Sequence, residues 1–170
     1  MSVRQTLARV DEELAAGRVP LARQRLRGLV SSFPADLELR RRLAEVYRLY
    51  GDDAEAGRWN YLEADRDPAE TAAFEARYAD PRRRMRALAW RGPEESTESP
   101  VVRERLAAVR TACSEAIGRP VDWESVRTLT EDDPQEVPGD RGGVLWGLLF
   151  LLIFLFAVVV WVNGFVAMFF

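Results

Sequence analysis

The stretch LELRRRLAEVYRLYGDDAEAGRWNYL, residues 37–62, predicts two antiparallel helices joined by a tight turn. The first helix is expected over residues 37–49. Its apolar residues recur at the spacing of one helical face: Leu39, Leu43, Val46 and either Tyr47 or Tyr50. Asp52, followed three residues later by Glu55, has the pattern of a capping box and starts a second helix over residues 53–64. These residues therefore predict a helical hairpin.

The residues before this hairpin predict another hairpin of the same kind. We expect one helix over residues 2–16 and a second over residues 20–31, with Gly17 ending the first. Their apolar positions again have helical spacing: Val3, Leu7, Val10, Leu14, Leu21, Ala22, Leu26, Leu29 and Val30. Gly17 and Gly51 are 34 residues apart, which indicates an internal repeat of one helical hairpin.

Two helical hairpins at this period resemble the tetratricopeptide repeat. In the second hairpin six residues occupy signature positions of that family: Leu43, Ala44, Tyr47, Gly51, Asp52 and Ala56. In the first hairpin the matching residues are Gly17, Ala22 and Leu26. Arg9 departs from the pattern, because the family usually has Leu there, and Pro34 lies where the family places its proline. The resemblance covers residues 3–66 and implies a short solenoid whose concave surface binds a peptide or protein.

A second resemblance is carried by two short stretches, AGRWNYL at 56–62 and TAAFE at 71–75. Together with the hairpins, they look like an actinobacterial family of unknown function. This resemblance implies no activity.

Helix-start signals continue beyond the two hairpins. Asp67-Pro68 and Asp80-Pro81 begin two further helices, which we expect to cap the repeats. The second of these has an apolar side formed by Met85, Leu88, Ala89 and Trp90. The sequence thus divides into a repeat-like domain with its caps, a polar linker, an additional helical segment, an acidic flexible tether and a membrane anchor: 1–90, 91–99, 100–129, 130–143 and 144–170.

The anchor is predicted from the run Gly143–Phe170, which contains no ionisable side chain. Val144–Val162 has nearly the roughly 20 residues that a helix needs to cross a bilayer. Trp146 and Trp161 are expected at its two interfaces, and Arg141 on the cytoplasmic side. We therefore expect a tail-anchored, single-pass protein of the cell membrane whose N-terminal domain is cytoplasmic.

Dimerisation through this span is a weaker hypothesis. It rests on Gly143 and Gly147, which form a small-xxx-small pair near the start of the apolar run.

Composition narrows the function. The chain has 24 Arg and no Lys against 27 acids, a net charge of −3, so nucleic acid is not an expected partner. Histidine is absent, which removes the commonest general base and metal ligand. The single cysteine, Cys113, lies on an apolar helix face and is interpreted as a buried thiol. We therefore expect no catalytic residues, no metal and no cofactor.

Candidate binding residues lie along the helix predicted at residues 37–49, on the side that faces the concave surface in such repeats: Glu38, Arg41, Arg42, Glu45 and Arg48. This row suits an acidic peptide or a C-terminal carboxylate, because guanidinium groups form charge-assisted hydrogen bonds with carboxylates. The alternative is a solvated face in which the two glutamates pair locally with Arg42 and its neighbours. A second cluster, Arg82, Arg83, Arg84 and Arg86, suggests contact with anionic lipid headgroups.

These features predict an all-α protein that acts as a membrane-tethered, cytoplasmic interaction module of the adaptor or scaffold type. Its partners would be the lipid bilayer and a protein or peptide. The alternative is a structural subunit of a larger membrane complex, with the span packed on a polytopic partner. An enzyme is a third option that no constellation of residues supports.

Overall fold

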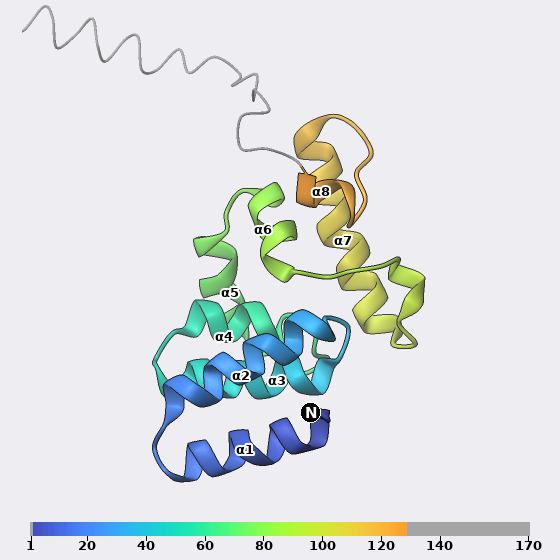
Figure 1. The fold of residues 1–170 in the computed structure, drawn as a ribbon. Helices are drawn as coiled ribbons and strands as arrows, with labels where there is room; N and C mark the ends of the chain where they lie inside the picture. Colours follow the sequence, from blue (N-terminus) through green and yellow to red (C-terminus); the bar gives the residue numbers. More distant parts are fainter. Residues whose placement is uncertain (1, 129–170) are drawn as a thin grey trace, which may run out of the picture. The chain divides into compact units, whose positions relative to one another are not determined.

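The computed structural model describes residues 2–128, and this part of the chain is helical throughout with no strand (Figure 1). Eight α-helices and one short 3-10 helix follow one another: α1 Val3–Ala15, α2 Val19–Ser32, α3 Leu37–Leu49, α4 Asp53–Asn60, α5 Pro68–Arg77, α6 Pro81–Leu88, η1 Glu94–Ser96, α7 Pro100–Ile117 and α8 Ser125–Thr128. The all-α prediction is confirmed for these residues. The predicted tether and anchor lie outside them.

Short polar side chains begin most of these helices. Ser2 and Gln5 form a capping box at α1, and the Asp52 carboxylate accepts a hydrogen bond from the Glu55 backbone N–H at α4. Four more N-caps accept backbone N–H groups in the same way: Asp36, Asp67, Asp80 and Ser99. These local signals explain why the helix starts follow directly from the sequence.

Helix α4 ends at Asn60, four residues before the predicted end. The reason is a long-range contact. Arg105 of α7 donates hydrogen bonds to the backbone carbonyls of Tyr61, Glu63 and Ala64. These carbonyls are thereby satisfied outside a helix, so the chain turns away instead of continuing α4.

The first hydrophobic core lies among α1 to α4, where each helix packs on the next in the chain. Its fully buried residues include those predicted from the hairpin pattern: Val10, Ala22, Leu26, Leu43, Ala44 and Ala56. Tyr47 rather than Tyr50 takes the core position, since Tyr50 is 42% exposed. Leu21 was predicted on the apolar face, and that prediction is wrong: its side chain is 45% exposed because the neighbouring Ala22 faces the core.

Helix α4 also packs closely on α5. Gly57 makes this possible, because a Cβ atom at this position would overlap the Glu70 backbone carbonyl. The successive packing of α1 to α5 is consistent with a helical-repeat-like fold.

The second hydrophobic core joins the end of α4 to α5, α6, α7 and α8. Phe74, Leu88, Leu106 and Cys113 are fully buried there, and Trp90 is 2% exposed. Ala89 was predicted on the apolar side of its helix but is exposed, because it ends α6 in the left-handed conformation at φ 52°. This turn directs the next residue, Trp90, into the core.

Residues 91–99, which the sequence presents as a polar linker, contain η1 and the buried side chain of Glu94. Among residues 2–128, none of the helices combines the length and the apolar character that a bilayer crossing requires.

Candidate interaction site

The predicted charged row lies on α3, and its arginines reach three different carboxylates. Arg41 forms an ion pair with Glu38, one turn earlier on the same helix. Arg42 instead extends to Asp11 of α1. The local pairing that the sequence suggests for Arg42 is therefore replaced by a contact between helices. The last member of the row, Glu45, is exposed.

Arg48 makes the most regular contact of the row. Its Nε donates to Glu70 Oε1 at 2.5 Å and a terminal nitrogen to Oε2 at 2.9 Å, which is a bidentate pair. The hydrogen bond with Glu70 is the main cause that raises the pKa of Arg48. Glu70 belongs to the first turn of α5, so the row connects α3 with both α1 and α5. The side chains from α1, α3 and α5 thus share one charged face.

Arg40, beside this row in the sequence, has a different environment. Its side chain is 1% exposed and donates hydrogen bonds to the backbone carbonyls of Pro34 at 3.2 Å and Leu88 at 2.9 Å. The guanidinium also lies 5.3 Å from the centre of the Trp59 ring. Burial, followed by the nearby charge of Arg58, lowers the pKa of Arg40 to about 9. Arg40 is therefore a buried connection between α3 and the end of α6.

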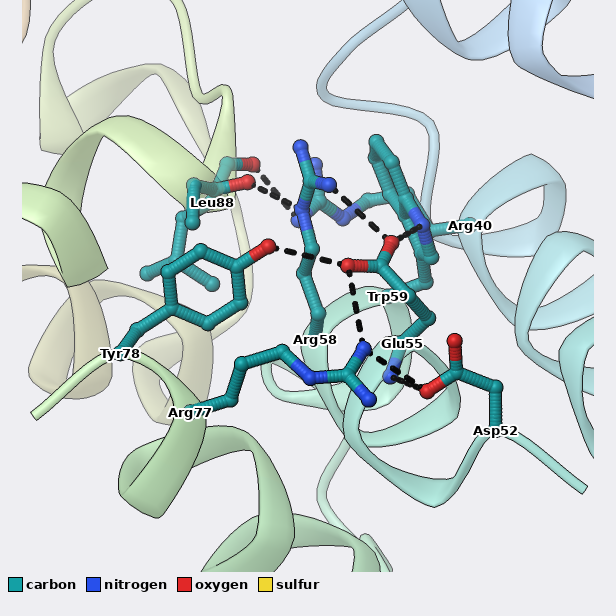
Figure 2. A network of polar contacts seen from close by, with 9 residues as sticks. Arg40, Asp52, Glu55, Arg58, Trp59, Arg77, Tyr78 and Leu88 are labelled. Carbon is teal, nitrogen blue, oxygen red and sulfur yellow. Dashed lines mark hydrogen bonds and ion pairs between the residues drawn. The ribbon is translucent and has the colours of Figure 1, made fainter.

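Glu55 organises the polar network beside Arg40 (Figure 2). Its carboxylate accepts hydrogen bonds from the Tyr78 hydroxyl at 3.0 Å, Arg58 at 3.1 Å and Trp59 Nε1 at 3.3 Å. Arg77 lies 3.9 Å from the same carboxylate and pairs with Asp52 at 2.8 Å. The sequence identifies Glu55 only as part of a capping box. Its partners come from α4, from the end of α5 and from the residue after it, so only the tertiary structure brings them together.

Two of these arginines donate hydrogen bonds to the last backbone carbonyls of α6. Arg58 donates to the Ala87 carbonyl at 2.5 Å, and Arg40 donates to the next carbonyl, that of Leu88. Positive charge at a helix C-terminus is favourable because the last carbonyls carry partial negative charge. The network therefore fixes α6 against α3 and α4.

The second arginine cluster is divided among several contacts. Arg84 donates to the backbone carbonyls of Tyr78 and Glu75, which satisfies the end of α5. Arg82 lies 3.7 Å from Asp80 and is only 16% exposed. Contact between this cluster and lipid headgroups stays a prediction.

A hollow of about 390 Å³ opens beside η1, α7 and the turn before α8. Buried Glu94 forms part of its wall and accepts hydrogen bonds from Arg110 Nε at 2.6 Å and Trp123 Nε1 at 3.1 Å. Three further carboxylates also line it: Glu95, Asp122 and Glu124. Sequence reasoning missed this feature, because Glu94 lies in a stretch whose composition is that of a linker.

No group of His, Cys, Asp and Glu residues suited to a metal ion occurs within residues 2–128. Cys113 is buried, and burial raises the pKa of its thiol, which disfavours the nucleophilic thiolate. The predicted membrane-interface residues Arg141, Trp146 and Trp161 lie outside the described part of the chain.

Comparison with known proteins identifies the family. The model of a family of unknown function, DUF6584, matches residues 1–170, and the chain belongs to that family. No curated protein and no solved structure matches the chain.

Proposed function

We propose that this member of the DUF6584 family is a non-catalytic interaction module that binds a partner protein on its α1–α3–α5 face. We propose further that residues 3–66 are two repeats of the tetratricopeptide type. The observation that carries the proposal is that two arginines of α3 form ion pairs with other helices. Arg42 pairs with Asp11 of α1, and Arg48 pairs with Glu70 of α5. These two ion pairs support one shared face formed by α1, α3 and α5, which would correspond to the concave surface of such repeats.

The chemistry of this face favours an acidic peptide or a C-terminal carboxylate. Arg41 and Glu38 are about half exposed, with side-chain exposures of 51% and 55%. An exposed pair of this kind contributes only about 0–1 kcal/mol, so a ligand carboxylate can replace Glu38 at little cost. Arg42 and Arg48 are more enclosed and hold the face in place. A bound carboxylate would thus meet Arg41, whose ion pair is exchangeable, on the same helix as Arg42 and Arg48, whose ion pairs join α3 to α1 and α5.

Location completes the proposed mechanism. The apolar run 144–162 would hold the module at the cytoplasmic side of the membrane, and the acidic stretch 130–143 would act as its tether. Restriction to a surface raises the effective concentration of a bound partner there without any new contact.

The proposal is tested by crosslinking the full-length chain in its native membranes and identifying the crosslinked proteins by mass spectrometry. Arg41→Glu with Arg42→Glu reverses two charges on the face. Arg9→Glu with Arg27→Glu is the matched control, because both residues are exposed and lie outside the charged row. We expect a protein that crosslinks to the wild type and the control but not to the first variant. Equal recovery from all three chains would contradict the proposal.

Replacing residues 144–162 with an unrelated apolar span separates this function from that of a complex subunit. An interaction module would retain its partner after the exchange. A subunit whose span packs on a polytopic protein would lose it.

A further inference from the structure

The hollow beside η1, α7 and the turn before α8, here called the Glu94 hollow, takes no part in the proposed α1–α3–α5 face. Its volume of about 390 Å³ lies within the range of roughly 300–1,000 Å³ that is typical of small-molecule sites. Trp123 and Pro93 belong to its wall and supply apolar surface beside charged groups. A site for a small ligand combines these two kinds of surface.

Glu94 fixes the shape of this hollow. The residue is 7% exposed, and its carboxylate accepts hydrogen bonds from Arg110 of α7 at 2.6 Å and from the Trp123 indole at 3.1 Å. One buried carboxylate therefore joins the three elements that form the walls. Because a buried charge is stable only when it is paired and hydrogen-bonded, these contacts persist without a ligand. The walls are preorganised, which lowers the cost of ordering them on binding.

The charge of the hollow is negative. Its described lining holds four carboxylates against one guanidinium, so three negative charges remain uncompensated. The guanidinium is that of Arg110, which Glu94 already binds. The hydrogen bond with Glu94 is the main cause that raises the pKa of Arg110, and the charge of Glu95 contributes to the same shift. Arg110 is thus held in the wall as part of an ion pair, and the other carboxylates set the sign of the site.

These three other carboxylates stay charged and accessible. Asp122 accepts the backbone N–H groups of Ser125 at 2.6 Å and Glu124 at 3.0 Å, and the hydrogen bonds from Ser125 are the main cause that lowers the pKa of Asp122. Glu95 is exposed. Glu124 pairs with Arg127 at 3.3 Å, but the two side chains are 79% and 49% exposed. Solvent screens such a pair, so a cationic ligand competes with it readily.

The spacing of the carboxylates distinguishes between kinds of cation. A metal ion needs several ligand atoms that converge on one point at about 2.0–2.6 Å. Within residues 2–128 no three His, Cys, Asp or Glu side chains are placed in that way, although four carboxylates line this one hollow. Negative charge spread around a wall that also contains an indole suits an extended organic cation, because its charged group and its alkyl chain contact different parts of the wall.

We propose that the Glu94 hollow is a binding site for an organic cation of the alkylammonium or alkylguanidinium class. The charged group donates hydrogen bonds to the carboxylates of Glu95, Asp122 and Glu124, and the alkyl chain lies against Trp123 and Pro93. The cation is either a free amine or the side chain of a lysine or arginine. The site does not depend on the proposed protein-binding face, because other elements form it.

The test follows the Trp123 indole N–H of the full-length chain by NMR in a nonionic detergent at constant ionic strength. Diaminobutane represents a free amine, and N-acetylarginine amide represents a side chain. N-acetylcitrulline amide is the uncharged counterpart of the second compound, and magnesium chloride is the metal-ion comparison. We expect a saturable shift with at least one of the two organic cations and at least tenfold weaker binding of the citrulline compound and of magnesium. The cation that binds more tightly assigns the source.

Two exposed carboxylates supply the variants, because neither is part of the buried Glu94 network or of the Asp122 turn. Glu95→Gln and Glu124→Gln should each weaken binding about threefold, and the double variant about tenfold. Glu12→Gln, an exposed carboxylate of α1, should bind as the wild type does. The proposal is overturned if neither organic cation gives a saturable shift, if the citrulline compound or magnesium binds as tightly, or if the double variant binds like the wild type.

Discussion

Removal of the Glu55 side chain should be among the most damaging single changes in the described part of the chain. The carboxylate is 12% exposed and accepts three hydrogen bonds, from Tyr78, Arg58 and Trp59. Each such bond contributes about 1 kcal/mol, and a buried donor left unpaired costs about 1–3 kcal/mol. The bond from Trp59 is long at 3.3 Å, and Arg58 is 21% exposed, so water compensates part of the loss. We expect Glu55→Ala to lower the free energy of unfolding by about 3 kcal/mol.

The assay is urea unfolding of the full-length chain in nonionic detergent, followed by tryptophan fluorescence and circular dichroism. Glu55→Gln keeps the volume and one acceptor, so it should cost about 1–2 kcal/mol. Glu12→Ala, an exposed carboxylate of α1, should stay within about 0.5 kcal/mol of the wild type. A double-mutant cycle with Tyr78→Phe should give a coupling energy of about 1 kcal/mol. If Glu55→Ala is neutral, or if this coupling is zero, the network does not hold α4 to the end of α5.

Three further changes test the packing and the turn geometry. Gly57→Ala should lower the free energy of unfolding by more than about 2 kcal/mol, because its Cβ would overlap the Glu70 carbonyl; a neutral result in urea unfolding would contradict this close approach. Ala89→Gly should raise the melting temperature, with a gain of about 0.5–1 kcal/mol, because glycine adopts positive φ without strain; a lower melting temperature would refute it. Arg40→Met tests the pKa of about 9: above this pH the folded protein releases a proton that the unfolded chain retains, so wild-type stability rises relative to the variant. The difference should grow by roughly 1 kcal/mol for each pH unit above 9, measured by urea unfolding, and a constant difference would contradict the lowered pKa.

The local sequence determines where most helices begin. The observed bounds of α3 equal the predicted ones, and the starts of α5 and α6 follow from Asp67-Pro68 and Asp80-Pro81. This succeeds because an N-cap acts within three residues of itself, so its physics is contained in the sequence. The helical periodicity likewise identifies most of the first core. It fails for Leu21, because the packing of α2 on its neighbours sets the exact boundary of the buried face.

Family membership and the hydrophobic run also come from the sequence, but the roles of the charged residues do not. Arg40, Arg41 and Arg42 are adjacent and chemically identical, yet Arg40 is buried against Leu88, Arg41 pairs with its own helix, and Arg42 reaches α1. A helix turns by about 100° per residue, so neighbours in sequence face different elements. Which element lies on each side is decided by contacts between residues far apart in the chain.

The same reason applies to Glu94 and Trp90. Composition presents the segment around Glu94 as a polar linker, but the Glu94 carboxylate is buried. Its burial is tolerated because it accepts hydrogen bonds from Arg110 and Trp123. Trp90 is apolar in pattern, yet only the tertiary structure shows that its buried Nε1 has no hydrogen-bond partner within residues 2–128. The sequence thus determined the helices of this protein and the residue types available to it. Only the tertiary structure decided which charges are paired and which buried polar atoms are left without a partner, because both depend on long-range contacts.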